Sequence, residues 1–283
     1  MSAALELLDL TKIYPTPTGP FVVVRDFNLT VAEGEFVCLV GHSGCGKSTV
    51  LSIAAGLNAA GSGRVTVGGR QISGPDIDRG VVFQSPSLLP WMSALDNVRL
   101  AVDQARPAAP REERETVARD CLARVGLASA IHRKPAELSA GMQQRVGIAR
   151  AFALTPKVLL LDEPFGMLDS LTRIELQEVL IELWAKERTT ALMVTHDVDE
   201  ALFLADRIAL MTNGPEARLG AVLEVPFARP RLRHDVIEHP AYYPLREDII
   251  TFLEDHAIAG VPPRTPVAAV SPVETLQPAG DLS

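Results

Sequence analysis

The chain has 283 residues, of which 47% are hydrophobic and 22% charged, so we expect most of it to fold into a packed globular body. Its formal net charge of −8 argues against a sequence-independent grip on nucleic acid, because such binding needs a basic face. Three cysteines, without paired CxxC spacing, give no zinc-site pattern and suit a reducing compartment. The opening residues lack a basic start followed by an apolar run, so no secretory signal is expected.

Strand patterns dominate the first part of the chain. An alternating opening stretch and residues 22–31 and 35–40 are predicted to be strands, with a turn at 33–35. A helix is expected from Lys47 to about Gly56. Strand-like segments follow in the sequences RVTVGG and GVVFQ.

From Ser93 to about Leu127 the pattern becomes helical, with a loop at 105–110. Asp96 stands three residues after Ser93, which is an N-cap arrangement. Further along, the patterns predict helices at 139–154 and 170–186 and strands at 157–162 and 189–195. Apolar strands that alternate with helices indicate an α/β fold with a parallel sheet and crossover helices. The helical block between the two halves of that sheet is expected to be an inserted subdomain.

The last part of the chain carries less information. Residues 231–258 are expected to form a short helical extension, with a helix near 242–253 that packs on the main body. Residues 259–283 are rich in proline and are predicted to be a disordered tail.

Residues 41–48, GHSGCGKS, fit the phosphate-loop pattern G-x-x-x-x-G-K-[ST] between an apolar strand and a helix. The glycines let successive N–H groups face one anion, and the helix N-terminus adds favourable potential. Lys47 is expected to reach terminal phosphates and Ser48 to bind Mg²⁺. Cys45 inside the loop predicts sensitivity to bulky thiol reagents. The expected nucleotide-binding residues here are Gly41, His42, Ser43, Gly44, Cys45, Gly46, Lys47, Ser48 and Thr49.

An apolar strand ends in Asp162 and Glu163. A carboxylate at the C-terminal edge of a parallel sheet lies where a nucleotide-bound metal is held, so Asp162 is a predicted metal ligand. Glu163, one residue on, is positioned to polarise an attacking water.

The sequence LSAGMQQR at 138–145 resembles the signature motif of ATP-binding-cassette (ABC) ATPases. Ser139 is expected to cap a helix, and its hydroxyl and the Gly141 N–H then offer donors to an anion. The resemblance implies that this anion is the terminal phosphate held by an opposite subunit. Ala140 departs from the family pattern, which usually has glycine there, and its methyl group would narrow the approach of the backbone.

Other family elements follow in order. Gln84 resembles the Q-loop glutamine, which touches metal or lytic water, and His196 resembles the switch histidine on the terminal phosphate. Asp169 resembles the D-loop aspartate at the dimer interface. Tyr14 resembles the aromatic residue that stacks on adenine.

The resemblance covers residues 5–225. It implies a P-loop NTPase parallel sheet with an antiparallel β subdomain and an inserted helical subdomain at about 86–150, within a cassette at 1–230. Residues 75–98 and 211–231 look most like importers of nitrate, sulfonate, taurine or bicarbonate, and the second stretch, with Tyr242, Tyr243 and Pro244, favours nitrate-type anions.

The implied activity is hydrolysis of ATP with Mg²⁺ in a head-to-tail pair, either a homodimer or a pair with a paralogous ATPase subunit. The resemblance further implies two transmembrane permease subunits, an indirect extracytoplasmic solute-binding protein and a peripheral place on the cytoplasmic face of the cell membrane. Nucleic acid is not an expected partner. Two alternatives stay open: a soluble non-transport ABC ATPase, and a small-molecule kinase with the same loop. The absence of coiled-coil insertions or a tandem cassette disfavours the first, and the signature helix disfavours the second.

Overall fold

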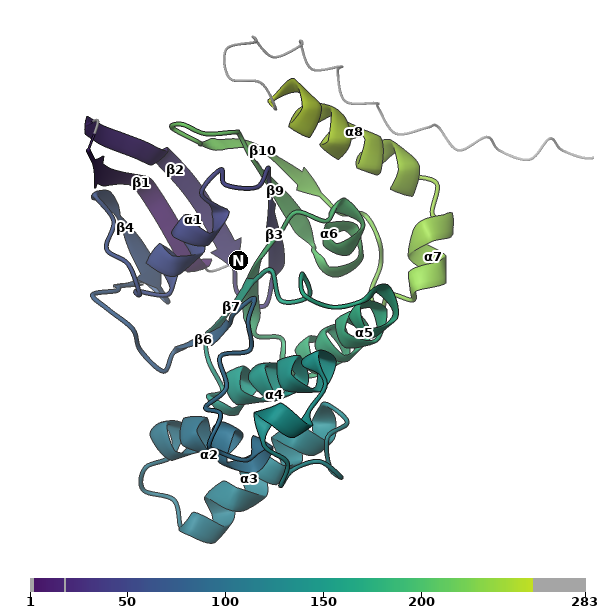
Figure 1. Cartoon of the computed structure of the whole chain (residues 1–283). Helices are drawn as coiled ribbons and strands as arrows, with labels where there is room; N and C mark the ends of the chain where they lie inside the picture. The colour runs from purple at the N-terminus through teal and green to yellow at the C-terminus, as the bar shows by residue number, and fades with distance from the viewer. Residues whose placement is uncertain (1–2, 18, 257–283) are drawn as a thin grey trace, which may run out of the picture.

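The computed structural model describes residues 3–17 and 19–256, which form two sheets and their covering helices (Figure 1). The predicted disordered tail at 259–283 and the last residues of the expected extension lie outside the described residues. None of the helices in the described ranges has the length and apolar character needed to cross a membrane.

The central sheet has six strands in the order β10-β9-β3-β8-β7-β6. Five of them run parallel: β6 (Arg79–Val82), β7 (Val158–Asp162), β8 (Thr190–Thr195), β3 (Phe36–Val40) and β9 (Arg207–Met211). The edge strand β10 (Leu219–Glu224) pairs antiparallel with β9. Every residue of β3 and β8 is buried, which explains their unbroken apolar character, since both faces of the sheet are covered.

The second sheet is antiparallel, in the order β2-β1-β4-β5. Its strands are β1 (Ala3–Thr16), β2 (Gly19–Ala32), β4 (Ser62–Val67) and β5 (Arg70–Gln71). Helix α1 (Lys47–Ala54) lies between the two sheets (Figure 1). Leu5 and Phe27 from this sheet share one core with Leu39 of β3 and Val50 of α1.

Helices α4 (Ala140–Ala153), α5 (Ser170–Glu187) and α6 (Val198–Leu204) bury the other face of the central sheet in a second core. Trp184 of α5 stands edge-on against Phe36 of β3, with ring centroids 5.6 Å apart. Such aromatic pairs add stability beyond the area they bury. This face carries the helices that begin at the candidate site.

The predicted helical block is present between β6 and β7. It contains α2 (Ala94–Ala105), α3 (Arg111–Arg124) and the short 3₁₀ helix η1 (Pro135–Glu137), and it lies at one end of the molecule (Figure 1). The predicted N-cap is confirmed, because Ser93 Oγ accepts a hydrogen bond from the Asp96 N–H at 3.1 Å. The loop predicted to interrupt the helices is also confirmed between α2 and α3.

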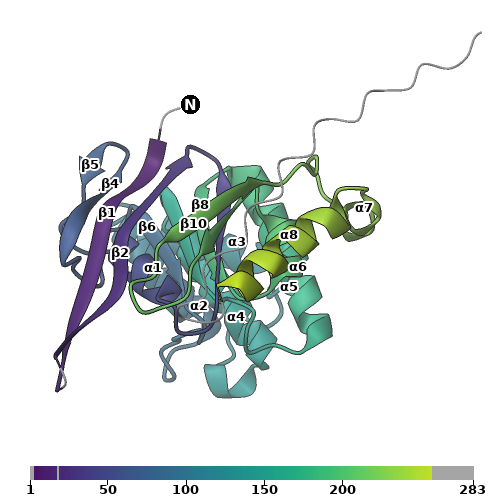
Figure 2. The ribbon, with the colours of Figure 1, turned by 90° about the horizontal axis from the view of Figure 1, so that it is seen from above.

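Two helices end the described chain: α7 (Arg233–Glu238) and α8 (Tyr242–Asp255). The expected helix near 242–253 is therefore confirmed, and it lies along α6 and the β9–β10 pair (Figure 2). Arg231 leads into this extension with only 7% of its surface exposed. Its guanidinium donates to the carbonyl oxygens of Phe203 and Ala205 at the end of α6 and to that of Phe227. The α/β fold class, with its antiparallel and helical additions, is as predicted.

Candidate functional site

The loop at residues 41–46 joins the buried strand β3 to helix α1. Gly46 has φ +109°, a left-handed conformation, and an added Cβ would lie 2.9 Å from Val23 Cγ1. A side chain is therefore excluded at this position both by backbone geometry and by the strand beneath. Gly44, with φ +78°, has open space where a Cβ would point, so the loop presents bare backbone there.

The Lys47 side chain lies inside this loop and binds its backbone. Its side chain is almost fully buried, and its Nζ donates to the carbonyl oxygens of Gly41 at 2.8 Å and His42 at 2.7 Å. An ammonium group has three donors, so one remains for an anion in the loop. The first N–H groups of α1 point to the same region, since helix N-termini have no intrahelical partners for them.

Ser48 and Asp162 meet across the ends of α1 and β7. Ser48 Oγ donates to Asp162 Oδ1 at 2.8 Å. Burial raises the pKa of Asp162 above its ordinary value, while the Ser48 hydrogen bond and the Lys47 charge oppose this shift. Two hard oxygen donors in contact are the ligand type that Mg²⁺ prefers.

Glu163 gathers two other predicted residues around one carboxylate oxygen. Its Oε2 lies 3.2 Å from His196 Nδ1 and 3.4 Å from Gln84 Nε2. The three side chains follow β7, β8 and β6, and parallel strands end at one edge of a sheet. Glu163 also has φ +41°, which is unusual for a residue other than glycine, and such backbone outliers cluster at functional sites.

Ser139 is the N-cap of α4, where its Oγ accepts from the Met142 N–H at 3.3 Å. Ser139 and Ala140 are both exposed at the start of α4. Gly141 is buried, and an added Cβ would lie 2.4 Å from Thr172 Cγ2 of α5. The sequence indicated Gly141 as a backbone donor; the structure adds a packing requirement that the sequence pattern did not reveal.

Asp169 is the N-cap of α5. Its Oδ1 accepts from the N–H groups of Leu171 at 3.2 Å and Thr172 at 3.1 Å, and hydrogen bonds with Thr172 hold its pKa below the usual range. The carboxylate is therefore an anion at neutral pH, and it stands at the surface beside exposed apolar side chains, Met167 and Leu171.

Gln144, which sequence reasoning did not assign, connects two parts of the site. Its side chain is 2% exposed, and Nε2 donates to the carbonyl oxygen of Phe83, next to Gln84. The same region contains a pocket of about 180 Å³ between the Gln84 loop, the start of α4 and the segment after Glu163. Its lining residues are Gln84, Ser85, Pro86, Ala140, Gln143, Gln144, Pro164, Met167 and Leu168. The two consecutive glutamines inside the signature motif were the available signal for this connection.

Tyr14 lies near the end of the β1–β2 hairpin. Its hydroxyl accepts from Asn58 Nδ2 at 2.7 Å, and the Lys12 ammonium stands 4.9 Å from the ring centroid. Within the described contacts, these partners place Tyr14 beside the segment after α1 and not in the group formed by Gln84, Glu163 and His196.

The burial of Cys45 argues against the expected sensitivity to bulky thiol reagents. The side chain is 1% exposed, and burial raises the pKa of the thiol. The thiolate is the reactive form, so a buried thiol with a raised pKa reacts slowly with bulky reagents.

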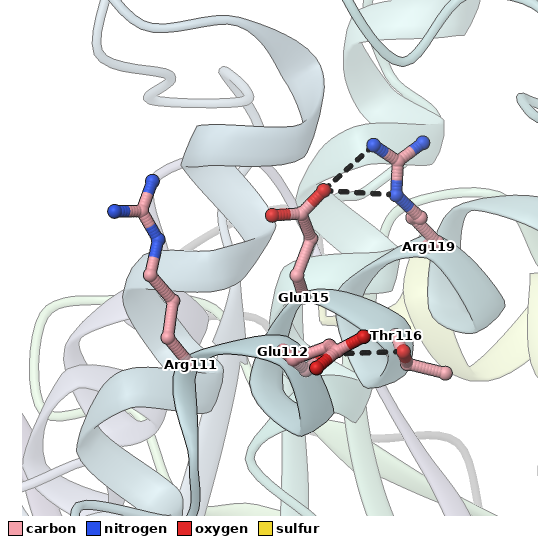
Figure 3. A pocket seen from close by; sticks show the side chains of 5 residues that line it. All are labelled: Arg111, Glu112, Glu115, Thr116 and Arg119. Atoms are coloured by element: carbon pink, nitrogen blue, oxygen red, sulfur yellow. Dashed lines mark hydrogen bonds and ion pairs between the residues drawn. The ribbon is translucent and has the colours of Figure 1, made fainter.

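A larger surface hollow, of about 530 Å³, lies on α3 away from these residues (Figure 3). All five lining residues come from one helix: Arg111, Glu112, Glu115, Thr116 and Arg119. Glu115 accepts two hydrogen bonds from Arg119 one turn on, at 2.7 and 3.1 Å. Glu115 and Arg119 thus pair with each other one helical turn apart, and the hollow does not include any of the predicted site residues.

Comparisons with known proteins agree with this geometry. The family model described as "ABC transporter" matches residues 24–166. The chain is 54% identical to the nitrate import ATP-binding protein NrtD of Synechococcus elongatus, over 86% of this chain and 88% of that protein. It is 51% identical to the bicarbonate transport ATP-binding protein CmpD of Synechocystis, over 89% of each. Among solved structures, the dimeric bacterial ABC transporter cassette MJ0796 superposes with a TM-score of 0.71 at 34% identity, covering 79% of this chain and all of that one.

Proposed function

The chain belongs to the ABC transporter family as an ATP-hydrolysing subunit, and we propose that it drives the import of a small oxyanion, nitrate first. The observation that carries the choice of solute is the 54% identity with a nitrate import ATP-binding protein over 86% of this chain. Bicarbonate is the second candidate, since bicarbonate transport ATP-binding proteins match at 51% and 52%.

The loop at 41–49 is the proposed site for the phosphates of ATP, with the third Lys47 donor directed at a phosphate oxygen. Ser48 and Asp162, 2.8 Å apart, would hold Mg²⁺, with Gln84 as a further ligand. When bound, this ion supplies positive charge against the phosphate oxygens. Tyr14 is the proposed stacking surface for adenine.

Glu163 is the proposed general base for hydrolysis. Its carboxylate accepts a proton from the attacking water, and His196 and Gln84 hold that carboxylate in place through contacts of 3.2 and 3.4 Å. His196, with 59% of its side chain exposed, remains accessible to the terminal phosphate. Positioned groups of this kind need no further reorganisation during the reaction.

Two cassettes are proposed to pair head to tail, as a homodimer or with a paralogous subunit. Each would present Ser139 and the Gly141 N–H to the ATP of its partner. The exposed Met167 and Leu171, at 65% and 74%, flank Asp169 and supply apolar surface for such a contact. ATP bound between two copies would link closure of the pair to nucleotide occupancy.

The helical subdomain at 86–150 is the proposed contact for two transmembrane permease subunits. Trp91, 67% exposed, projects from the segment between Gln84 and α2 and offers an anchor for such a partner. This arrangement places the chain peripherally on the cytoplasmic face of the membrane. The solute-binding protein would then act through the permease and not touch this chain.

The test has two parts. Lys47→Ala in the purified chain should reduce phosphate release from ATP by about 100-fold or more, because the phosphates lose a preorganised cation. Near-normal turnover would refute the site. In vesicles that contain the permease and solute-binding partners, nitrate should stimulate ATP hydrolysis and bicarbonate should not. The opposite preference would make bicarbonate the solute, and stimulation by neither would refute both assignments.

A further inference from the structure

Helix α8 contacts the phosphate loop directly. His42 Nε2 lies 2.7 Å from the carbonyl oxygen of Leu253, 211 residues further along the chain. A carbonyl oxygen only accepts, so His42 donates from Nε2, which both the neutral Nε2–H tautomer and the imidazolium can do. The carbonyl oxygen of His42 in turn accepts from Lys47 Nζ. The last described helix is thus bonded to the loop residue that orients Lys47.

The other end of α8 is tied to α6, the helix that begins just after His196. Tyr242 Oη and Arg246 Nε both donate to Asp199 Oδ1, at 2.8 and 2.7 Å. Asp199 lies in the first turn of α6. The Arg246–Asp199 ion pair is partly exposed, with 40% and 49% of the two side chains accessible, so the contact fixes where α8 lies on α6 more than it adds stability.

A second route runs from α7 to the residue that precedes His196. Arg233 Nη2 donates to Gln177 Oε1 at 2.6 Å, and Gln177 Nε2 donates to Glu200 Oε1 at 2.8 Å. Thr195 Oγ1 completes the chain by donating to the other oxygen of Glu200. Gln177, Glu200 and Thr195 are all buried, so water does not compete for the two bonds to Glu200.

Gly220 of β10 leaves room for the Phe252 ring of α8. A Cβ at Gly220 of β10 would lie 2.4 Å from Phe252 Cζ, so the Phe252 ring occupies the space that a side chain would need. Phe252 precedes Leu253, whose carbonyl oxygen receives the His42 bond. Figure 2 shows α8 lying against β10 and α6.

We propose that residues 231–256 act as a positioning element of the ATPase site. The extension holds the phosphate loop through His42 and the His196 segment through Asp199 and Glu200, and so fixes one relative to the other. A loop that is already ordered binds its ligand with a smaller entropy cost. This inference rests on the ATPase role of the site and assigns a role to a segment outside the phosphate, signature and carboxylate motifs.

The test measures KM for ATP, kcat and Tm on the full chain. Gly220→Ala, outside the site, displaces Phe252 and should raise KM about three- to tenfold, the effect of one lost hydrogen bond. His42→Ala should raise KM by a similar factor. His42→Gln, whose amide N–H can still donate, should keep KM close to the wild-type value. The double variant Gly220→Ala/His42→Ala should match the larger single effect, because both break the same contact. Arg246→Met, which frees α6, should lower kcat more than it raises KM.

Gly74→Ala is the matched control, since a Cβ there has no atom within 4 Å, and it should leave KM and kcat unchanged. The extension would have only a structural role if Gly220→Ala lowered Tm but left KM at the wild-type value and Arg246→Met left kcat unchanged. If the two substitutions raised KM multiplicatively in the double variant, the effect of His42 would be independent of α8. Either result overturns this inference while wild-type ATP hydrolysis still supports the proposed function. A wild-type chain that neither binds nor hydrolyses ATP would overturn both.

Discussion

The close contact between α4 and α5 at Gly141 gives the sharpest stability prediction. Gly141→Ala places a methyl group 2.4 Å from Thr172 Cγ2, whereas carbon atoms prefer a separation of about 3.5–4 Å. Either the helices must separate or Thr172 must move. Overpacking of this kind costs about 1–3 kcal/mol, and replacing glycine by alanine in a helix returns about 1 kcal/mol. We therefore expect a net loss of about 1 kcal/mol in the free energy of unfolding.

A double-mutant cycle with Thr172→Ser isolates the clash. Serine lacks the Cγ2 methyl group but keeps the hydroxyl that faces Asp169. In the Thr172→Ser background, Gly141→Ala should become neutral or stabilising by up to about 1 kcal/mol. The coupling free energy should then be about 1–3 kcal/mol, measured as the difference in urea unfolding at constant m-value. A coupling near zero, or a Gly141→Ala single variant more stable than wild type, would refute the packing argument.

The remaining predictions concern four other positions. Glu163→Gln should still bind ATP in a filter-binding assay but release phosphate about 100-fold more slowly or worse, since the base is lost; full activity would move that role to another residue. Burial raises the pKa of Glu200 to about 7, so its proton stabilises the folded chain fully below about pH 4.5, and this stability is lost as pH rises through 7. Glu200→Gln should therefore remove about 3 kcal/mol of pH-dependent stability between pH 4 and pH 8, and unfolding curves that keep the wild-type slope would contradict this. Native Cys45 should react with a bulky disulfide reagent far more slowly than in urea, and equal rates would show that the loop opens freely. Ala140→Gly should preserve or raise ATPase activity because the methyl group is exposed, whereas a marked loss would mean that a partner surface requires it.

The sequence was most informative where one local pattern has one physical cause. The strand–glycine loop–helix pattern at Lys47 and the cap at Ser93 depend on neighbouring residues only, and both are present as predicted. The meeting of Gln84, Glu163 and His196 could be expected as well, because each follows a strand and parallel strands end together.

Contacts between distant segments were not predictable in this way. Hydrophobic periodicity does not predict the bond from His42 to Leu253 or the contact between Gly141 and Thr172. Each of these depends on how distant elements pack in three dimensions. The burial of Cys45 was unpredictable for the same reason. A thiol in a glycine-rich loop reads as accessible, but the strand and helix beneath that loop bury it.

The contacts of the Arg231 guanidinium limit where the C-terminal extension of one such chain could be replaced by that of another. It is a buried cation whose pKa burial lowers to about 10, and it is held by carbonyl oxygens on the cassette side of the proposed boundary between residues 230 and 231. A chimera joined at that boundary would have to supply an arginine from the incoming segment or leave those acceptors without their donor. Grafts that begin after Arg231 should therefore be tolerated better than grafts that replace it.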